Sequence, residues 1–283
     1  MTSGDVYKIE GPACISFSGG RTSAYMLYQI LQAWDGKLPN DVVACFANTG
    51  KEMEETLRFV DRCSKEWSVP IVWVEYRNTE NKFEVVNFET ASREGEPFME
   101  LVKKRNYLPN PVTRFCTTEL KIRPMANYLR TIWGGYNKTE LESFSLVGIR
   151  ADEQRRAAKI PIDRLPLVTA GVTSKIVGDF WQAHAFDLEL PNMNGVTMHG
   201  NCDLCFLKGA NQVQSLIAEN PERAIWWAKA EALVQSSGYA TGQGARFRKD
   251  RPSYQQMYDF AKQQQDWIKN SSQDETIPCF CGD

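Results

Sequence analysis

The sequence has no long apolar run and no strong excess of charge of either sign. None of its apolar stretches approaches the length of a membrane-spanning helix, and residues 1–10 lack the basic-then-apolar layout of a secretory signal. A formal net charge of −2 gives the whole chain no attraction to nucleic acid or to anionic membranes, so either contact would need a local basic patch. We therefore expect a cytoplasmic protein with no membrane partner.

Internal repeats and long low-complexity linkers are also absent from the 283 residues. A chain of this length, with 42% apolar residues, can bury a full core and fits one large domain or a domain with an appendage. In its first half, apolar strand-like runs alternate with helix-patterned segments. The runs are 14–18, 42–48, 71–76 and 143–149, and the helix-patterned segments are 22–34, 52–67, 97–105 and 119–133.

Strands that are apolar throughout and separated by helices are typical of a buried parallel sheet. We therefore predict an α/β fold in which a parallel sheet carries helices on both faces. A further helix is expected to begin at Thr173 or Ser174. The remaining predicted helices are 204–218, 221–236 and 252–269. The predicted layout is an α/β domain over residues 1–170 and a mostly helical part over residues 171–283.

The eight cysteines divide by their surroundings. Three fall within apolar strand or helix patterns, where cysteine packs as a small hydrophobe, namely Cys14, Cys45 and Cys63. A reducing compartment disfavours disulfides, so the other five are candidates for catalysis or metal ligation: Cys116, Cys202, Cys205, Cys279 and Cys281. The CDLC segment in a glycine-flanked loop suits a metal centre, a redox dithiol or half of a zinc site.

The segment SFSGGRTS, residues 16–23, joins the first strand to the first helix. Glycines let the backbone approach an anion closely, and the free N–H groups of a helix start carry partial positive charge. Hydroxyl and guanidinium groups add donors, so the candidate phosphate ligands are Ser18, Gly19, Gly20, Arg21, Thr22 and Ser23. The pattern is neither GxxxxGK[ST] nor GxGxxG, and a plain strand-to-helix turn with a hydroxyl cap is the alternative.

Three more segments accompany this turn: ANTGKEMEETLRFV, RFCTTELKIRP and VGIRADEQRRA. Together the four motifs resemble the PP-loop family, which contains ATP pyrophosphatases and phosphoadenylyl-sulfate (PAPS) reductases, over roughly residues 12 to 210. The resemblance implies an adenine-nucleotide alpha-hydrolase-like fold that binds ATP or PAPS across the strand ends. It also implies nucleotide contacts from Asn48, Thr49, Gly50 and Arg150, with Asp152 beside them and Glu52 or Glu55 near a ribose or Mg²⁺.

Bacterial adenylyl-sulfate reductases resemble this chain in their cysteine pattern, which binds a 4Fe–4S cluster. The resemblance implies cluster ligation by Cys116, Cys202 and Cys205, with Arg114 and Lys121 offsetting the negative charge of the thiolates. The second cysteine of that pattern is Thr117 here. The fourth iron is then held by Cys279 or Cys281, or stays open for sulfide or substrate, and an all-thiolate zinc site is the alternative.

Two enzymatic interpretations follow from the resemblance. In the preferred one, ATP adenylylates a substrate and sulfur from a donor displaces AMP, although Thr22 stands where ATP pyrophosphatases usually carry Asp. In the other, the Cys281 thiolate attacks PAPS or adenylyl sulfate, and a thioredoxin-like reductant releases sulfite. The candidate catalytic residues are Arg150, Asp152, Lys121 and Cys281. A non-catalytic, metal-stabilised nucleotide-binding module is a third hypothesis.

The loop GARFRKDRPSY gathers positive charge near the C-terminus. Its cations are Arg246, Arg248, Lys249 and Arg251, with Phe247 and Tyr254 as candidates for stacking on bases. Such a patch suits a nucleic acid as sulfur acceptor or a nucleotide 3′-phosphate, and a solvated loop is the alternative. We also expect a homo-oligomer.

Overall fold

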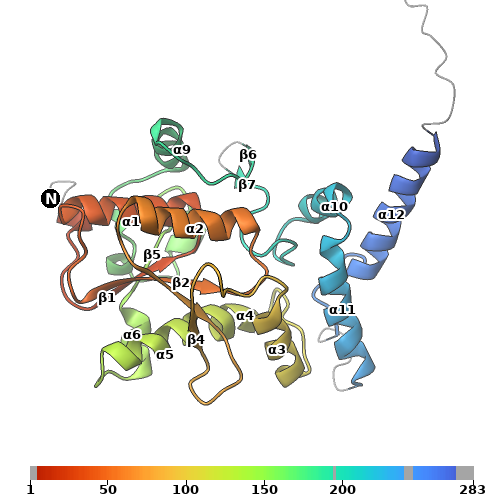
Figure 1. The fold of residues 1–283 in the computed structure, drawn as a ribbon, viewed down its shortest axis with the longest axis horizontal. Helices are drawn as coiled ribbons and strands as arrows, with labels where there is room; N and C mark the ends of the chain where they lie inside the picture. The colour runs from red at the N-terminus through yellow and green to blue at the C-terminus, as the bar shows by residue number, and fades with distance from the viewer. Residues whose placement is uncertain (1–4, 194–195, 239–244, 272–283) are drawn as a thin grey trace, which may run out of the picture. The chain divides into compact units, whose positions relative to one another are not determined.

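The computed structural model describes residues 5–193, 196–238 and 245–271 (Figure 1). The chain divides into two compact units. The first unit comprises Met1–Arg105 and Thr113–Asp203, and the second comprises Asn106–Val112 and Leu204–Asp283. The predicted division at residue 170 stays a prediction. No helix within the described ranges is long and apolar enough to cross a membrane.

A five-stranded sheet forms the centre of the first unit. Its strands are β1 (Ala13–Phe17), β2 (Val42–Asn48), β3 (Ile71–Glu75), β4 (Glu84–Val86) and β5 (Ser145–Val147). They lie in the order β4-β3-β2-β1-β5, and every pairing is parallel except that of β3 with β4. The α/β fold predicted from the sequence is confirmed, and it is consistent with an adenine-nucleotide alpha-hydrolase-like fold.

The antiparallel strand β4 corrects the prediction of a purely parallel sheet. Its three residues, EVV, are exposed or half-buried at the edge of the sheet. A search for apolar, fully buried runs therefore misses it.

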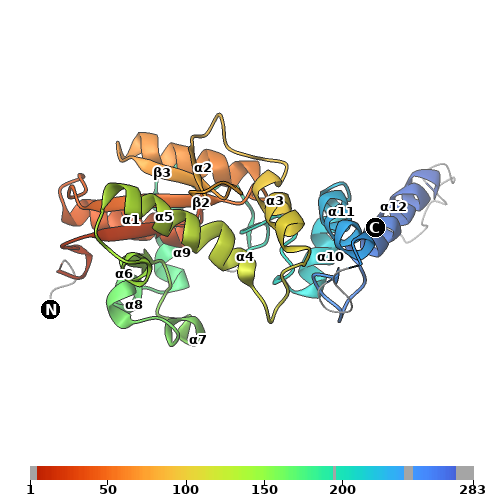
Figure 2. The ribbon, with the colours of Figure 1, turned by 90° about the horizontal axis from the view of Figure 1, so that it is seen from below.

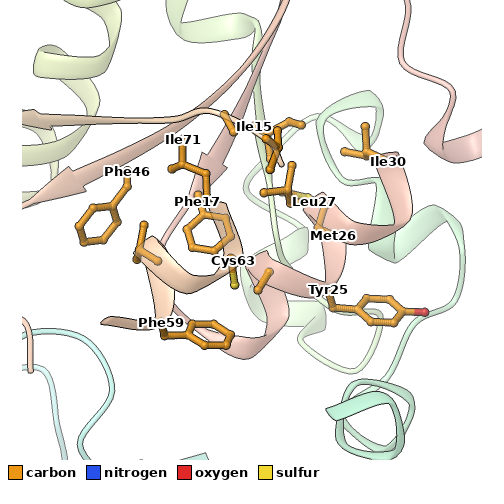
Figure 3. Close-up of a cluster of buried hydrophobic side chains, with 14 of the residues drawn as sticks. Ile15, Phe17, Tyr25, Met26, Leu27, Ile30, Phe46, Phe59, Cys63 and Ile71 are labelled. Atoms are coloured by element: carbon orange, nitrogen blue, oxygen red, sulfur yellow. The ribbon is translucent and has the colours of Figure 1, made fainter. Parts of the chain in front are cut away.

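Helices cover both faces of the sheet (Figures 1 and 2). One face packs against α1 (Arg21–Ala33), α2 (Glu54–Glu66) and α9 (Ser174–Ala183). The other packs against α5 (Arg123–Ile132) and α6 (Lys138–Ser143). Because strand side chains alternate, Ile15 and Phe17 join the first cluster while Cys14 joins the second. Figure 3 shows the first cluster, with Phe17 among side chains of α1 and α2.

Three cysteines are part of these cores. Cys14, Cys45 and Cys63 are all fully buried, which confirms that they pack as small hydrophobes. A hydrogen bond with Cys14 raises the pKa of Cys45 far above its ordinary value, and burial adds to this effect. Burial likewise raises the pKa of Cys63. The Cys45 and Cys63 thiols are therefore unsuited to act as nucleophiles.

Shorter elements complete the first unit. They are α3 (Glu96–Arg105), α4 (Phe115–Thr117) followed by a π-helical turn (Thr118–Ile122), α7 (Gln154–Ala157), α8 (Pro166–Thr169), β6 (Asn192–Met193), β7 (Val196–Thr197) and 3₁₀ turns at Asp5–Tyr7 and Ile162–Arg164. The helix expected to begin at Thr173 or Ser174 is α9, whose first residue is Ser174.

The second unit is helical. Its helices are α10 (Ala210–Glu219), α11 (Arg223–Ser236) and α12 (Tyr254–Ser271). The predicted helix over 204–218 begins six residues later than expected, at Ala210. The preceding residues form a turn in which the Lys208 amide donates to the Cys205 carbonyl at 2.9 Å. Gly209 then caps α10.

Candidate functional site

The turn between β1 and α1 depends on glycine at position 19. Gly19 has φ of +74°, in the left-handed region that side chains rarely adopt. A Cβ atom there would lie 2.5 Å from Thr56 Cγ2 and 3.3 Å from Phe46 Cε2. The backbone of the turn therefore packs directly onto β2 and α2, and alanine does not fit.

Two serines hold the turn closed. The Ser18 amide donates to Ser23 Oγ at 3.1 Å, and Ser23 Oγ donates to the Gly20 carbonyl at 2.9 Å. The Ser18 hydroxyl lies 3.0 Å from the Ser23 hydroxyl. Since the Ser23 proton goes to Gly20, Ser18 is the donor of that pair, and Ser23 shapes the turn. Gly20 precedes α1 and provides no side-chain cap, and the first-turn amides, which have no intrahelical partner, carry the positive end of the helix dipole.

A pocket of ≈ 450 Å³ opens beside this turn, at the carboxyl ends of β1 and β5. This volume is within the range of small-molecule sites, and the position is where open α/β sheets bind ligands. The lining residues are Ser18, Gly19, Gly20, Arg21, Thr22, Thr56, Gly148, Arg150, Glu153, Arg156, Ser174, Val177, Gly178, Leu188, Asn192, Thr197, Gly200 and Asn201. The close approach of β5 to α1 needs Gly148, whose Cβ would lie 3.1 Å from Ser23 Cα.

Arg21 has a different environment from the one expected of a phosphate ligand. Its guanidinium is buried and forms a bidentate pair with Asp187, with both N–O distances at 2.7 Å. It also donates to the carbonyls of Leu188 and Leu190 and, at 3.0 Å, to Thr197 Oγ1. Arg21 thus ties the segment after α9 to the start of α1. Nothing local in the sequence marks Asp187 as its partner.

Arg150 lies in the pocket, next to the turn. Its Nη1 donates to Thr22 Oγ1 at 3.2 Å, and its Nε donates to Asp152 Oδ1 at 2.9 Å. Glu153 lies 3.7 Å from the same guanidinium. The structure therefore brings together the motifs around Thr22 and Arg150, which are 128 positions apart. The sequence did not single out Glu153, although it belongs to the same motif.

Asp152 orients Arg150 and also meets the start of α9. Its Oδ2 accepts the Ser174 amide at 3.0 Å. Burial disfavours the ionised carboxylate, but the hydrogen bonds from Ser174 and Arg150 outweigh it and lower the pKa of Asp152. Asp152 is thus an anion at neutral pH, and it holds the Arg150 guanidinium in the pocket.

The start of the ANTGKEMEETLRFV motif, at the end of β2, is buried and forms a separate hydrogen-bond network. The side-chain amide of Asn48 donates from Nδ2 to Glu75 Oε1 at 2.6 Å and to the Ser92 carbonyl at 2.8 Å. Gly50 has φ of +75°, and a Cβ there would lie 3.0 Å from the Gly95 backbone. Asn48, Thr49 and Gly50 do not line the pocket beside the turn. Their predicted role in binding the nucleotide stays a prediction.

Thr49 links this motif to two others. Its amide and hydroxyl donate to Glu52 Oε2 at 2.9 and 2.8 Å, and its Oγ1 lies 3.4 Å from Cys202 Sγ. Glu52 Oε1 in turn lies 3.7 Å from Lys121 Nζ.

A buried ion pair joins Lys51 to Asp203 at 3.1 Å, and Asp203 follows Cys202 in the sequence. Cys202 is thereby held against the end of β2, and Lys121 faces Glu52.

The candidate metal ligands are placed as follows. Cys116 is half-buried in α4, Cys202 is buried at the end of the first unit, and Cys205 is half-buried near the start of the second unit. Among the described residues, no three His, Cys, Asp or Glu side chains are grouped as a metal site. Cys279 and Cys281 lie outside the described residues.

The basic loop of the second unit differs from a free cationic patch. Arg248 forms a bidentate pair with Asp250, which lowers the pKa of Asp250 to about 2. Phe247 and Tyr254 are fully buried, so the suggestion that they stack on bases is wrong: both rings pack against Trp227 inside the unit. Lys249 is exposed.

The fold and the pocket define the class: an α/β protein with a glycine turn and an uncapped helix start at the carboxyl end of its sheet. A model of the phosphoadenosine phosphosulfate reductase domain matches residues 12–166. The chain therefore belongs to the phosphoadenosine phosphosulfate reductase domain family, whose members bind nucleotide substrates and are generally enzymes.

Two relatives extend this match. The chain is 30% identical over 207 residues to the uncharacterized nin region protein ORF290 of Escherichia phage lambda, covering 70% of this chain and 67% of the relative. It is 29% identical over 158 residues to the uncharacterized protein MJ0066 of Methanocaldococcus jannaschii, covering 56% of this chain and 27% of that relative.

Proposed function

We propose that this chain is a cytoplasmic enzyme that binds ATP, adenylylates a substrate and completes a sulfur transfer. The observation that carries the proposal is the uncapped start of α1 beside the Gly19 turn, in a pocket that also contains Arg150. Free amides, a helix N-terminus and a guanidinium are the groups that bind phosphate. The triphosphate lies with its β- and γ-phosphates on the turn, accompanied by Mg²⁺.

The reaction has two steps. An oxygen atom of the acceptor attacks the α-phosphorus of ATP, and the bond to the bridging oxygen breaks as pyrophosphate leaves with the electron pair. Sulfur at the hydrosulfide level, supplied by a donor, then attacks the carbon that bears the adenylyl group, and AMP leaves. The α1 amides and Arg150 stabilise the charge that develops on pyrophosphate, while Asp152 keeps Arg150 oriented.

A sulfonucleotide reductase is the second candidate, and the match to the phosphoadenosine phosphosulfate reductase domain favours it. In that reaction the Cys281 thiolate attacks the sulfate sulfur of PAPS or adenylyl sulfate, and the nucleotide leaves. A thioredoxin-like reductant then attacks the resulting thiosulfonate and releases sulfite, becoming oxidised itself. Both candidates use the same pocket for the phosphates and differ in the bond that breaks.

The products separate the two candidates. Purified full-length chain is incubated anaerobically with ATP, bulk RNA as the acceptor and sulfide as the sulfur donor, or with PAPS or adenylyl sulfate and a thioredoxin-like dithiol, and pyrophosphate, AMP and sulfite are quantified. We expect pyrophosphate and AMP from ATP, and no sulfite from the other two nucleotides. Deletion of residues 279–283 should leave ATP cleavage intact. Sulfite production that depends on Cys281 would establish the reductase, and binding of nucleotide without any product would indicate a non-catalytic module.

We also propose that Cys116, Cys202 and Cys205 ligate a 4Fe–4S cluster, with Cys279 as the candidate fourth ligand and zinc as the alternative metal. The support is the C-x-x-C spacing of Cys202 and Cys205, with Cys116 in a segment that resembles the first half of the ligand pattern. Anaerobically purified protein should be brown, with absorption near 400 nm. Cys202→Ser should remove most of the iron, whereas Cys63→Ala, in the sheet core, should retain it. A colourless protein with stoichiometric zinc would contradict the cluster.

A further inference from the structure

The turn that contains Cys205 has its backbone carbonyls satisfied largely by side chains of the basic loop. The Tyr254 hydroxyl donates to the Leu204 carbonyl at 2.7 Å. Arg251 Nη2 donates to the carbonyls of Phe206 and Lys208, at 3.2 and 3.0 Å. The Cys205 carbonyl accepts the Lys208 amide at 2.9 Å. These four carbonyls therefore all accept hydrogen bonds from donors within the second unit.

A buried carboxylate holds the donors in place. Glu231, on α11, is only 3% exposed and accepts the Phe247 and Tyr254 amides at 3.2 and 3.0 Å. Its two hydrogen bonds therefore hold both ends of the segment 247–254, which contains Arg251. The Tyr254 ring stacks on Trp227 at a centroid distance of 5.3 Å, which fixes the direction of its hydroxyl. The turn and its donors form one hydrogen-bonded assembly.

Several cations of the loop are engaged within the second unit. Arg248 is neutralised by Asp250 and also donates to the Phe206 carbonyl at 3.3 Å. Arg251 is half-buried with its Nη2 committed to two carbonyls. Of the four predicted cations, Lys249 is the exposed one. Arg248 and Arg251 both donate to backbone carbonyls of the turn that contains Cys205.

We infer that Arg251 and Tyr254 are positioning residues that fix the backbone on both sides of Cys205 and so present its thiol in one geometry. The importance of that geometry for catalysis or metal ligation rests on the proposed function. The positioning itself does not, because it concerns contacts within the second unit. A carbonyl that loses its donor in a buried turn drives local opening, and opening exposes Cys205.

The test measures the alkylation rate of Cys205 by iodoacetamide, followed by mass spectrometry. The full-length chain is used as purified and after removal of any bound metal with a chelator. Arg251→Ala removes the Nη2 that donates to both carbonyls, and Tyr254→Phe loses only the hydroxyl. Each should speed alkylation of Cys205 about tenfold or more in the chelated protein. Lys249→Gln, which changes an exposed neighbour, should have no effect.

Two further measurements separate positioning from general instability. Cys63, in the core of the first unit, should stay as slow to react in every variant as in the parent chain. Guanidinium ion at low millimolar concentration should slow the alkylation of Cys205 in Arg251→Ala, because it can occupy the vacated site. Unchanged Cys205 rates in both variants, a parallel increase at Cys63, or no rescue by guanidinium would each overturn the inference. The readout needs neither turnover nor a cluster, so it is independent of whether the proposed function holds.

Discussion

Gly19→Ala is expected to weaken ATP binding at least about 100-fold and to lower the free energy of unfolding by about 2–5 kcal/mol. The left-handed φ of +74° is unfavourable for alanine, and its Cβ would overlap Thr56 Cγ2 at 2.5 Å. The turn must then move away from α2, which displaces the amides that face the pocket. Calorimetric titration with ATP and urea denaturation measure the two effects.

Gly134→Ala is the matched control for this substitution. A methyl group at Gly134 would meet no atom within 4 Å, its φ is not in the left-handed region, and it does not line the pocket. The ATP affinity and stability of this variant should match those of the parent chain. Gly20→Ala is also sterically tolerated, since its Cβ would meet only Ser18 Oγ at 3.7 Å. Full ATP affinity in Gly19→Ala would refute the assignment of the turn as the phosphate site.

Arg150→Gln is expected to reduce the rate of pyrophosphate release from ATP by about 10²–10³-fold. Arg150 is the pocket cation that reaches Thr22 on the turn, and Asp152 holds it there. Glutamine is neutral and too short to reach the turn from the same backbone position. Steady-state measurement of pyrophosphate, with ATP affinity determined separately, shows whether the loss falls on kcat.

The control for Arg150 lies in the same motif. Arg155 is exposed and does not line the pocket, so Arg155→Gln should change pyrophosphate release by less than about twofold. Thermal unfolding of both variants should resemble that of the parent chain. Equal losses in the two variants would show that general charge, and not the geometry of Arg150, governs the reaction.

Much of the site could be predicted because its signals are local. A short apolar strand followed by SGGRTS predicts a glycine turn whose backbone can approach an anion closely. The structure places that turn beside the pocket. Arg150 follows β5, a neighbour of β1, and parallel neighbours end at the same edge of a sheet. The family resemblance placed both segments at one nucleotide site, and the parallel pairing of β1 with β5 explains why they share one pocket.

Arg21 and the basic loop have partners that local signals do not reveal. An arginine beside a glycine turn has the chemistry of a phosphate ligand, but Asp187, 166 positions away, holds this guanidinium. Arg251 lies in a run of cations, yet it donates to carbonyls 43 and 45 positions earlier. The sequence predicts the charge of such a group and not its partner.

The order of apolar runs and turn residues in this sequence determined the α/β fold and the glycine turn, because backbone conformation and strand burial depend on neighbouring residues, and four motifs carried the resemblance to the family. Only the tertiary structure decided which polar groups meet: Arg21 with Asp187, Thr49 with Cys202, and Arg251 with the Cys205 turn. A buried donor or acceptor must find a partner, and that partner is chosen by how the chain packs, whatever the distance along the sequence.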